Sequence, residues 1–430
     1  MDKIVIQGGN RLTGEVTIGG AKNAVVALLP AALLARDVVT LENVPSIRDV
    51  NIMLDVMSRL GAIIQRLDKT TYRIDTTHIG PQSVPNDIAK RLRASYYLIG
   101  AMLGAFNKAD VALPGGCDFG VRPINLHIKG FKSLGADVEV ANGMVKAVAK
   151  DGLIGSSIYM DEVSVGATIN VMLAAVKAKG LTIIENAARE PHIVDLANFL
   201  NRMGANVRGA GTDVIKIKGV EELHGCYYSV IPDQIEAGTY MVAAAATGGD
   251  VLIKNVTPKH LESITAKLIE CGVDVIEYDD EVRVTSSGDI KPCNIKTMPH
   301  PGFPTDMQPQ IVTLLALAKG TSIVTESVWE SRFRYVDELA RLGANVKVEG
   351  GKMAVIQGVS GFKGACVNAT DLRAGAAMVI AGLCAEGETE IEDIYHIERG
   401  YEEIVSKLRA LGADIEKRYY PDDNELEMRA

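Results

Sequence analysis

The chain has 430 residues, of which 47% are hydrophobic and 23% charged, and its formal net charge is -9. This length exceeds what one hydrophobic core usually serves, so two domains are expected. The negative charge argues against a protein that binds nucleic acid or a membrane surface, because either would need a basic field. Any anion-binding site must therefore be a local cluster of Lys and Arg.

The apolar runs and the cysteines indicate where in the cell the protein is located and which kinds of site it can contain. The longest apolar runs, residues 23–35 and 374–385, are shorter than a membrane-spanning helix requires, and the N-terminus lacks a signal-peptide pattern. The six cysteines include no C-x-x-C pair, which argues against a zinc site or a disulfide framework. We therefore expect a cytoplasmic protein with reduced thiols, no metal site and no membrane insertion.

Each of six repeats is expected to begin with a helix that is apolar on nearly every side. In chain order these helices are expected within residues 21–35, 89–106, 164–180, 233–249, 304–320 and 369–387. Such a pattern is typical of helices buried in a core. Short strands are expected after several of them, at residues 37–44, 181–187, 251–256 and 321–326.

A short signature ends the second, amphipathic helix of each repeat. Its glycines, separated by 74, 69, 68, 71 and 69 residues, are Gly61, Gly135, Gly204, Gly272, Gly343 and Gly412. Each glycine is expected to cap its helix in the left-handed conformation. Alternating apolar residues then predict a hairpin, as over residues 346–355 with Gly-Gly at the turn. Six units of helix, strand, helix and hairpin predict an α/β protein with three units per domain and a boundary near residues 220–232.

Polar residues gather at the starts of the apolar helices. They are Lys22 and Asn23 in the first, Arg91 and Arg93 in the second, Asp306 in the fifth, and Asp371 and Arg373 in the sixth. Helix N-termini favour anions, so added Lys and Arg predict a phosphate or carboxylate site. The alternative is that Asp306 and Asp371 are N-caps and the arginines form surface ion pairs.

Further candidates lie in loops. Arg122, Arg332 and Arg399 are either anion ligands or ordinary solvated arginines. Cys117 stands between glycines and an arginine rather than in an apolar run, where a structural cysteine would be expected. This placement favours a reactive role, although one cysteine does not identify a reaction.

The combined motifs resemble the UDP-N-acetylglucosamine 1-carboxyvinyltransferases of the enolpyruvyl transferase family. The resemblance covers nearly the whole chain and is carried by "GAKNA" (20–24), "RAS" (93–95), "LPGGC" with "RP" (113–123), "SVGAT" (164–168), "ENAAREP" (185–191), "PHPGFPTDMQ" (299–308), "ATDLRA" (369–374) and "HIERGYE" (396–402). It implies a two-domain inside-out α/β barrel of six βαβαββ-like repeats. One domain would be residues 21–230 with the Cys117 loop, the other residues 1–20 plus 231–430, and the active site would lie between them.

The resemblance also implies an activity. Such enzymes transfer the enolpyruvyl group of phosphoenolpyruvate to the 3′-hydroxyl of UDP-N-acetylglucosamine and release phosphate through a tetrahedral intermediate, without a cofactor. This is the first committed step of peptidoglycan synthesis, and hence of cell wall biogenesis, cell shape and cell division. Protein partners and oligomeric state stay open.

Residue roles follow from the same resemblance. Cys117 would be the general acid and the residue that fosfomycin alkylates, Asp306 the base at the sugar hydroxyl, and Asp371 an aid to proton movement, with Lys22 and Arg399 also catalytic. An enol ether protonates poorly, so an acid must be held close to it. The implied substrate contacts are Lys22, Asn23, Arg93, Arg122, Pro123, Ser164, Val165, Gly166, Asp306, Val328, Arg332, Arg373 and Arg399.

Three points bear on this interpretation. Some members carry lysine just before "VSVG", where this chain has Glu162, so diphosphate binding is expected to depend more on Arg122 and backbone groups. The sister enzyme that uses shikimate 3-phosphate shares the fold and many cations. The alternative from outside the enzymes is a catalytically silent paralogue, which would bind a UDP-sugar as a sensor or regulator.

Overall fold

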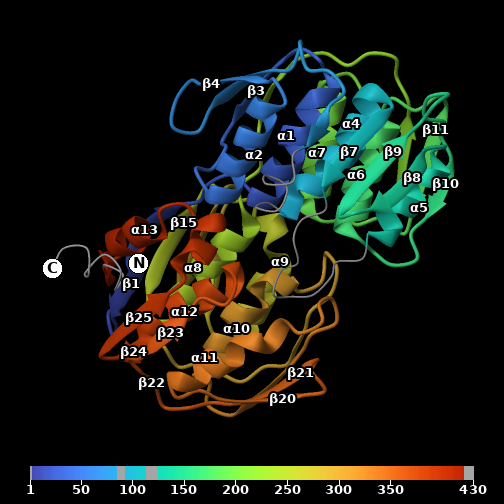
Figure 1. The fold of residues 1–430 in the computed structure, drawn as a ribbon. Coiled ribbons are helices and arrows are strands. Elements are labelled where there is room, and N and C mark those ends of the chain that lie inside the picture. The colour runs from blue at the N-terminus through green and yellow to red at the C-terminus, as the bar shows by residue number, and fades with distance from the viewer. Residues whose placement is uncertain (1, 85–92, 113–123, 421–430) are drawn as a thin grey trace. The chain divides into compact units, whose positions relative to one another are not determined.

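The computed structural model describes residues 2–84, 93–112 and 124–420 (Figure 1). The chain folds as two compact units, unit 1 with residues 1–19 and 232–430, and unit 2 with residues 20–231. Each unit has its own continuous hydrophobic core.

Unit 2 contains three repeats with the same strand order in the described residues. Their sheets are ordered β14-β3-β5-β4, β6-β7-β9-β8 and β10-β11-β13-β12. In each sheet the first two strands are parallel and the last two form an antiparallel hairpin. The elements are α1 (Lys22–Ala31), η1 (Ala32–Leu34), β3 (Val38–Glu42), α2 (Arg48–Arg59), β4 (Ile63–Arg66), β5 (Tyr72–Asp75), β6 (Ser83–Val84), η2 (Arg93–Tyr96), α4 (Tyr97–Phe106), β7 (Lys108–Ala112), α5 (Asn125–Ser133), β8 (Asp137–Ala141), β9 (Met144–Val148), β10 (Ser157–Tyr159), α6 (Val165–Ala175), β11 (Leu181–Glu185), α7 (Pro191–Arg202), β12 (Asn206–Arg208), β13 (Val214–Lys218) and β14 (Tyr227–Ser229).

Unit 1 repeats the pattern with sheets β2-β15-β17-β16, β18-β19-β21-β20 and β23-β25-β1-β26. Its elements are β1 (Asp2–Gln7), β2 (Thr13–Thr17), α8 (Gln234–Ala246), β15 (Asp250–Lys254), η3 (Pro258–His260), α9 (Glu262–Glu270), β16 (Asp274–Glu277), β17 (Glu281–Thr285), β18 (Ile295–Lys296), η4 (Thr305–Met307), α10 (Gln308–Leu315), β19 (Thr321–Thr325), η5 (Arg332–Tyr335), α11 (Val336–Arg341), β20 (Asn345–Glu349), β21 (Met353–Gln357), β22 (Phe362–Lys363), β23 (Cys366–Asn368), α12 (Leu372–Cys384), β24 (Ala385–Glu386), β25 (Glu388–Glu392), η6 (Ile394–Arg399), α13 (Ile404–Ala410) and β26 (Asp414–Tyr419).

Strand β1 explains why unit 1 is discontinuous in sequence. It lies between β25 and β26 and pairs antiparallel with both, as the blue strand among red ones in Figure 1 shows. The N-terminal strand thus completes the sheet of the last repeat. Similarly, β14 from the end of unit 2 pairs in parallel with β3 and completes the first repeat of that unit.

The apolar helices of each unit form its centre, with the sheets around them. In unit 1, α8, α10 and α12 pack against one another, and in unit 2, α4 packs against both α1 and α6. Glycine permits the closest approach: a Cβ at Gly100 of α4 would lie 2.3 Å from the carbonyl oxygen of Asn170 in α6. The expected α/β fold of six βαβαββ-like repeats, with helices inside, is confirmed.

The repeated glycine signature has the predicted conformation. All six signature glycines have φ between 85° and 102° and follow the amphipathic helices. The hairpin predicted for residues 346–355 is formed by β20 and β21, with Gly350 and Gly351 at positive φ. Left-handed backbone therefore ends each repeat's second helix, where a side chain would be strained.

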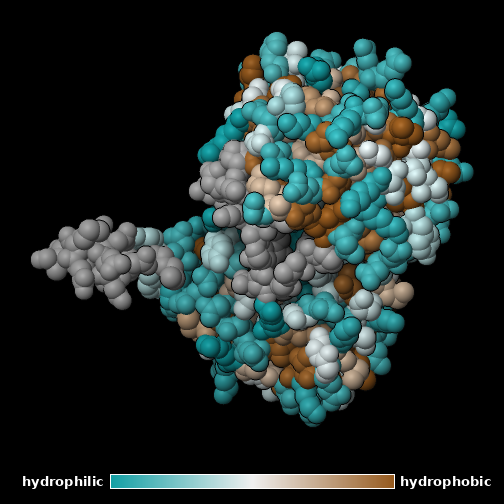
Figure 2. Space-filling view, turned by 45° about the vertical axis from the view of Figure 1, so that its right-hand side comes forward, coloured by the Kyte–Doolittle hydropathy of each residue, from teal (hydrophilic) through white to brown (hydrophobic). Residues whose placement is uncertain are grey.

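The surface is mixed in character. Hydrophilic residues dominate the face in Figure 2, with hydrophobic residues among them. Within the described ranges, no helix has the length and apolarity needed to cross a membrane.

Candidate active site

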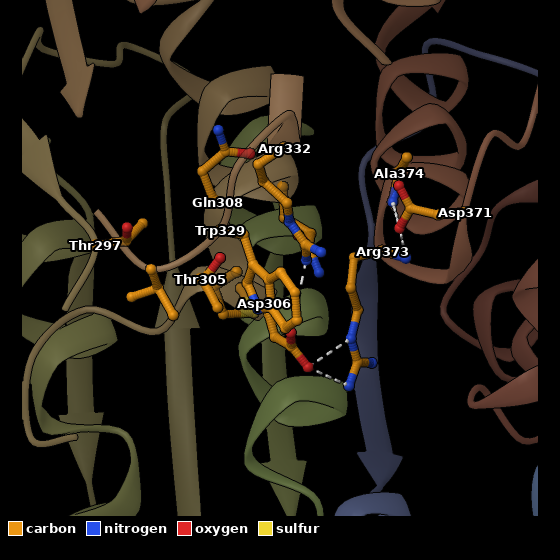
Figure 3. Close-up of polar contacts among 12 residues, drawn as sticks. Thr297, Thr305, Asp306, Gln308, Trp329, Arg332, Asp371, Arg373 and Ala374 are labelled. Carbon is orange, nitrogen blue, oxygen red and sulfur yellow. Dashed lines mark hydrogen bonds and ion pairs between the residues drawn. The ribbon is translucent and has the colours of Figure 1, made fainter. Parts of the chain in front are cut away.

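Three helix N-termini of unit 1 come together around Arg373. Arg373 lies in the first turn of α12, Asp306 lies in η4 directly before α10, and Asp233 caps α8 through its side chain. The guanidinium of Arg373 donates from Nε and Nη2 to Oδ2 of Asp306 at 3.1 and 3.0 Å, as Figure 3 shows. Since helix N-termini carry partial positive charge, this meeting point favours anions.

A second arginine faces the same carboxylate. Arg332 begins η5, and its Nη2 lies 3.5 Å from Oδ1 of Asp306. Arg332 is 7% exposed and Arg373 3%. Among the described residues, Nε and Nη2 of Arg332 and Nη1 of Arg373 are buried without a hydrogen-bond partner. Buried donors are normally satisfied, so these nitrogens indicate a place for the oxygen atoms of an anionic ligand.

The surroundings keep Arg373 charged and in place. Burial is the largest single influence and opposes its charge, but Asp306, Tyr401 and Asp233 together outweigh burial and raise the pKa of Arg373. The guanidinium lies 5.5 Å from the ring centroid of Tyr401, a cation–π distance. The Tyr401 hydroxyl in turn lies 2.9 Å from Oγ1 of Thr239 and accepts from Nε2 of Gln310 at 3.2 Å. Sequence reasoning missed Tyr401 as a support, although it stands in the "HIERGYE" motif.

The two aspartates at these helix starts have different roles. Oδ1 of Asp371 accepts from the backbone N–H groups of Arg373 and Ala374 at 2.8 and 3.1 Å, so the N-cap interpretation is confirmed for Asp371. It is wrong for Asp306, which stands in η4 and contacts the guanidinium groups instead. The surface ion-pair alternative is wrong for Arg373, and the solvated-arginine alternative is wrong for Arg332, because both are buried.

Lys22 in unit 2 pairs with a residue that sequence reasoning missed. Its Nζ lies 3.1 Å from Oδ2 of Asp49, with side chains 13% and 4% exposed. Asp49 is in the first turn of α2, next to Val50 on the buried side of an amphipathic helix. A carboxylate on the buried side of an amphipathic helix is the feature of the sequence that could have identified Asp49. Gly20 fixes the approach to α1, since a Cβ there would lie 1.7 Å from the carbonyl oxygen of Asn43.

A second helix N-terminus of unit 2 carries the expected nucleotide contacts. Ser164 caps α6, and its Oγ accepts from the N–H of Ala167 at 3.3 Å. Gly166 in the first turn lies against two rings, because a Cβ there would come within 3.1 Å of His127 Cε1 and of the Tyr96 hydroxyl oxygen. The first turn of α6 thus combines backbone N–H groups with an aromatic wall, which suits a polar, ring-containing ligand.

The remaining predicted residues are placed as follows. Asn23, Val165 and Arg399 are half-buried, Val328 is 40% exposed in the loop after β19, and Glu162 is exposed. Arg93 begins η2. Cys117, Arg122 and Pro123 lie outside the described residues. Within unit 1 the structure therefore brings Asp306, Arg332 and Arg373 together; within unit 2, Lys22 with Asn23 and Ser164 with Val165 and Gly166 mark two helix starts.

Comparisons with known proteins agree with one another. The family model described as EPSP synthase (3-phosphoshikimate 1-carboxyvinyltransferase) matches residues 6–408. A UDP-N-acetylglucosamine 1-carboxyvinyltransferase of Clostridium botulinum is 61% identical over 416 residues, covering 96% of this chain and 99% of that protein. A UDP-N-acetylglucosamine 1-carboxyvinyltransferase 3 of Caldanaerobacter subterraneus subsp. tengcongensis is 59% identical over 415 residues, with coverages of 96% and 99%.

Solved structures give the same fold. The enolpyruvyl transferase NikO from Streptomyces tendae has a TM-score of 0.87 at 26% identity, covering 98% of this chain and 99% of that one. An EPSP synthase from Acinetobacter baumannii has a TM-score of 0.77 at 19% identity, with coverages of 97% and 100%. At that lower identity the likeness concerns the fold alone.

Proposed function

Since the chain belongs to the EPSP synthase family, we propose that it transfers the enolpyruvyl group of phosphoenolpyruvate to the 3′-hydroxyl of UDP-N-acetylglucosamine and releases phosphate. Two relatives that carry this activity in their names are 61% and 59% identical over 96% of the chain, which supports the choice of acceptor. In the structure, the observation that carries the proposal is Asp306 held between two buried arginines that keep unsatisfied donors.

The cation set suits a small substrate with two anionic groups. Phosphoenolpyruvate has a carboxylate and a phosphate, and the planar fork of arginine binds either in a bidentate manner. Arg332, Arg373 and Arg399 come from unit 1, whereas Lys22 and Arg122 come from unit 2. We therefore propose that residues of both units must bind the substrates before the reaction proceeds.

The proposed chemistry is addition followed by elimination. Asp306 takes the proton of the sugar 3′-hydroxyl while the oxygen bonds to carbon 2 of phosphoenolpyruvate and Cys117 protonates carbon 3. The tetrahedral intermediate then loses phosphate from carbon 2 and a proton from carbon 3, which restores the vinyl group. Arg373 serves this step by holding Oδ2 of Asp306 through two hydrogen bonds, which fixes the carboxylate in one orientation.

The sugar nucleotide would occupy the helix start of α6. Its backbone N–H groups at Ser164, Val165 and Gly166 offer donors to polar groups of the nucleotide, and Asn23 and Val328 would contact the sugar. Arg93 and Pro123 complete the proposed contacts. With these substrates the protein would act in the cytoplasm, at the first committed step of peptidoglycan synthesis.

A substrate exchange tests this choice. Purified protein receives phosphoenolpyruvate with either UDP-N-acetylglucosamine or shikimate 3-phosphate, and phosphate release is followed over time. We expect release with the sugar nucleotide alone. Release only with shikimate 3-phosphate would give the chain the activity named in the family description. Saturable sugar-nucleotide binding without release would identify a silent paralogue.

A further inference from the structure

The carboxylate of Glu326 joins three separate segments of unit 1. Its Oε1 accepts from Oγ1 of Thr297 at 2.7 Å and from the backbone N–H groups of Val328 and Trp329 at 2.8 and 3.0 Å. Its Oε2 accepts from Oγ1 of Thr305 at 3.0 Å. Three of the donor residues, Thr297, Thr305 and Trp329, are labelled in Figure 3. These donors come from the chain after β18, from η4 and from the loop after β19.

Glu326 is buried, and within residues 2–84, 93–112 and 124–420 it has no cationic partner. The residue is 1% exposed, and no Lys or Arg among the described residues forms an ion pair with it. Removing a carboxylate from water costs several kcal/mol, which only its hydrogen bonds offset here. A buried carboxylate without an ion pair adds little to stability. The four hydrogen bonds that Glu326 accepts therefore indicate a role other than stabilising the fold.

Two of the three joined segments, η4 and the loop after β19, lead to candidate site residues. Thr305 directly precedes Asp306, the proposed base. Val328, a proposed sugar contact, is itself one of the donors, and Arg332 begins η5 in the same stretch of chain. Loss of the Glu326 carboxylate would release η4 and this loop from each other.

Thr297 strengthens the same connection. Its Oγ1 donates to Glu326 and accepts from the N–H of Ser327 at 3.0 Å, and its own N–H donates to the carbonyl of Thr325 at 2.9 Å. The cluster is thus continuous with the parallel pairing of β18 and β19. A rigid sheet end therefore carries both η4 and the loop.

We propose that Glu326 is a positioning residue that fixes Asp306 and Val328 relative to each other for the transfer reaction. It touches neither substrate and acts through η4 and the 327–329 loop. This inference rests on the proposed function. It assigns the Thr305 bond to placing the base and the bonds to Thr297, Val328 and Trp329 to placing the sugar contact.

Four variants separate these contributions. Glu326→Ala removes every bond and should lower kcat at least about tenfold while raising the KM for UDP-N-acetylglucosamine, as expected for the loss of several hydrogen bonds. Thr305→Val removes only the bond to Oε2 and should lower kcat roughly threefold or more with little change in that KM. Thr297→Val should mainly raise the KM. Glu326→Gln keeps the acceptor at Oε1 and can donate to Thr305, so it should retain most of the wild-type activity that Glu326→Ala loses.

Two control variants test whether the loss of an acidic charge or the loss of stability could by itself explain the kinetic changes. Glu330→Gln removes an exposed acid from the same loop and should leave kcat and both KM values unchanged. Val284→Ala opens a cavity in the core of unit 1 within β17, away from the Glu326 cluster, and should lower Tm without lowering kcat. A merely structural role of Glu326 would make Glu326→Ala behave like Val284→Ala.

Steady-state kinetics with both substrates, beside Tm, decide the matter. Unchanged kcat and KM in Glu326→Ala, or a kcat loss that Glu326→Gln shares fully, would overturn the inference. If Glu326→Ala does not fold, the two threonine variants decide: kcat and KM moving together in both would refute the division of roles. An inactive wild-type protein would instead refute the proposed function, and the inference would fall with it.

Discussion

Replacing Asp195 by Asn should stabilise unit 2 at neutral pH. Asp195 lies in α7, is 1% exposed, and accepts a 2.6 Å hydrogen bond from the Tyr228 hydroxyl. Burial raises the pKa of Asp195 from 3.8 to about 6, against the hydrogen bonds that Tyr228 and the backbone of Ile231 supply. The folded protein therefore holds this proton at a pH where the unfolded chain has released it.

The direction and the size of the change in stability follow from the difference in the pKa of Asp195 between the folded and the unfolded protein. Because the folded state binds more protons between pH 4 and 6, the contribution of Asp195 to stability is complete below pH 4 and is lost as pH rises through 6. The difference between 3.8 and about 6, at about 1.4 kcal/mol for each pH unit, amounts to about 3 kcal/mol. For a unit of this size, about 1 kcal/mol moves Tm by roughly 2–4 °C, so Asp195→Asn should gain roughly 6–12 °C at pH 7.5.

Thermal unfolding followed by circular dichroism between pH 4 and 8 measures this gain. The difference in Tm between Asp195→Asn and wild type should be small at pH 4 and grow to its full size near pH 7. Asp137→Asn, at a side chain that is 83% exposed, serves as a control and should show little difference at any pH. An Asp195→Asn difference that stays constant from pH 4 to 8 would refute the reasoning.

Substitutions at Cys117, Arg399 and Lys22 test the site. Cys117→Ala should keep UDP-N-acetylglucosamine binding, measured by calorimetry, and lose most turnover, whereas Cys117→Asp should remain active and resist fosfomycin; full activity of the alanine variant would exclude the general-acid role. Arg399→Ala should raise the KM for phosphoenolpyruvate more than the KM for the sugar nucleotide, and equal effects on both would argue against its placement. Lys22→Met takes the ammonium group from buried Asp49 and should cost about 3 kcal/mol or more. Adding Asp49→Asn should recover Tm but not activity, and no recovery would show that the ion pair is not the cause.

Local periodicity was enough to predict the repeats. The signature glycines have positive φ because a left-handed cap ends each amphipathic helix, and this depends only on neighbouring residues. The apolar helices were identified because they are apolar on nearly every side, and Gly100 against Asn170 shows how closely they pack. Sequence alone did not place β1 between β25 and β26, because strand pairing across the whole chain leaves no local pattern.

The arginines of the candidate site were named from the sequence, but the residues that support them were not. Arg373 stood out through its charge at the start of an apolar helix and Arg332 as a loop arginine within the family resemblance, and the structure buries both. Asp49 and Glu326 were missed, because their partners lie far away in sequence or are backbone groups. The different roles of Asp306 and Asp371 were also not separable, since both precede helices and only three-dimensional contacts show which one caps.

The mass of the product tests the central proposal most directly. The protein would be incubated with phosphoenolpyruvate and UDP-N-acetylglucosamine, and the nucleotide sugar analysed by mass spectrometry beside a sample without protein. The proposed function requires a UDP-sugar heavier by one carboxyvinyl group, formed in step with phosphate release. A UDP-sugar of unchanged mass, from protein whose folding is verified, would contradict it.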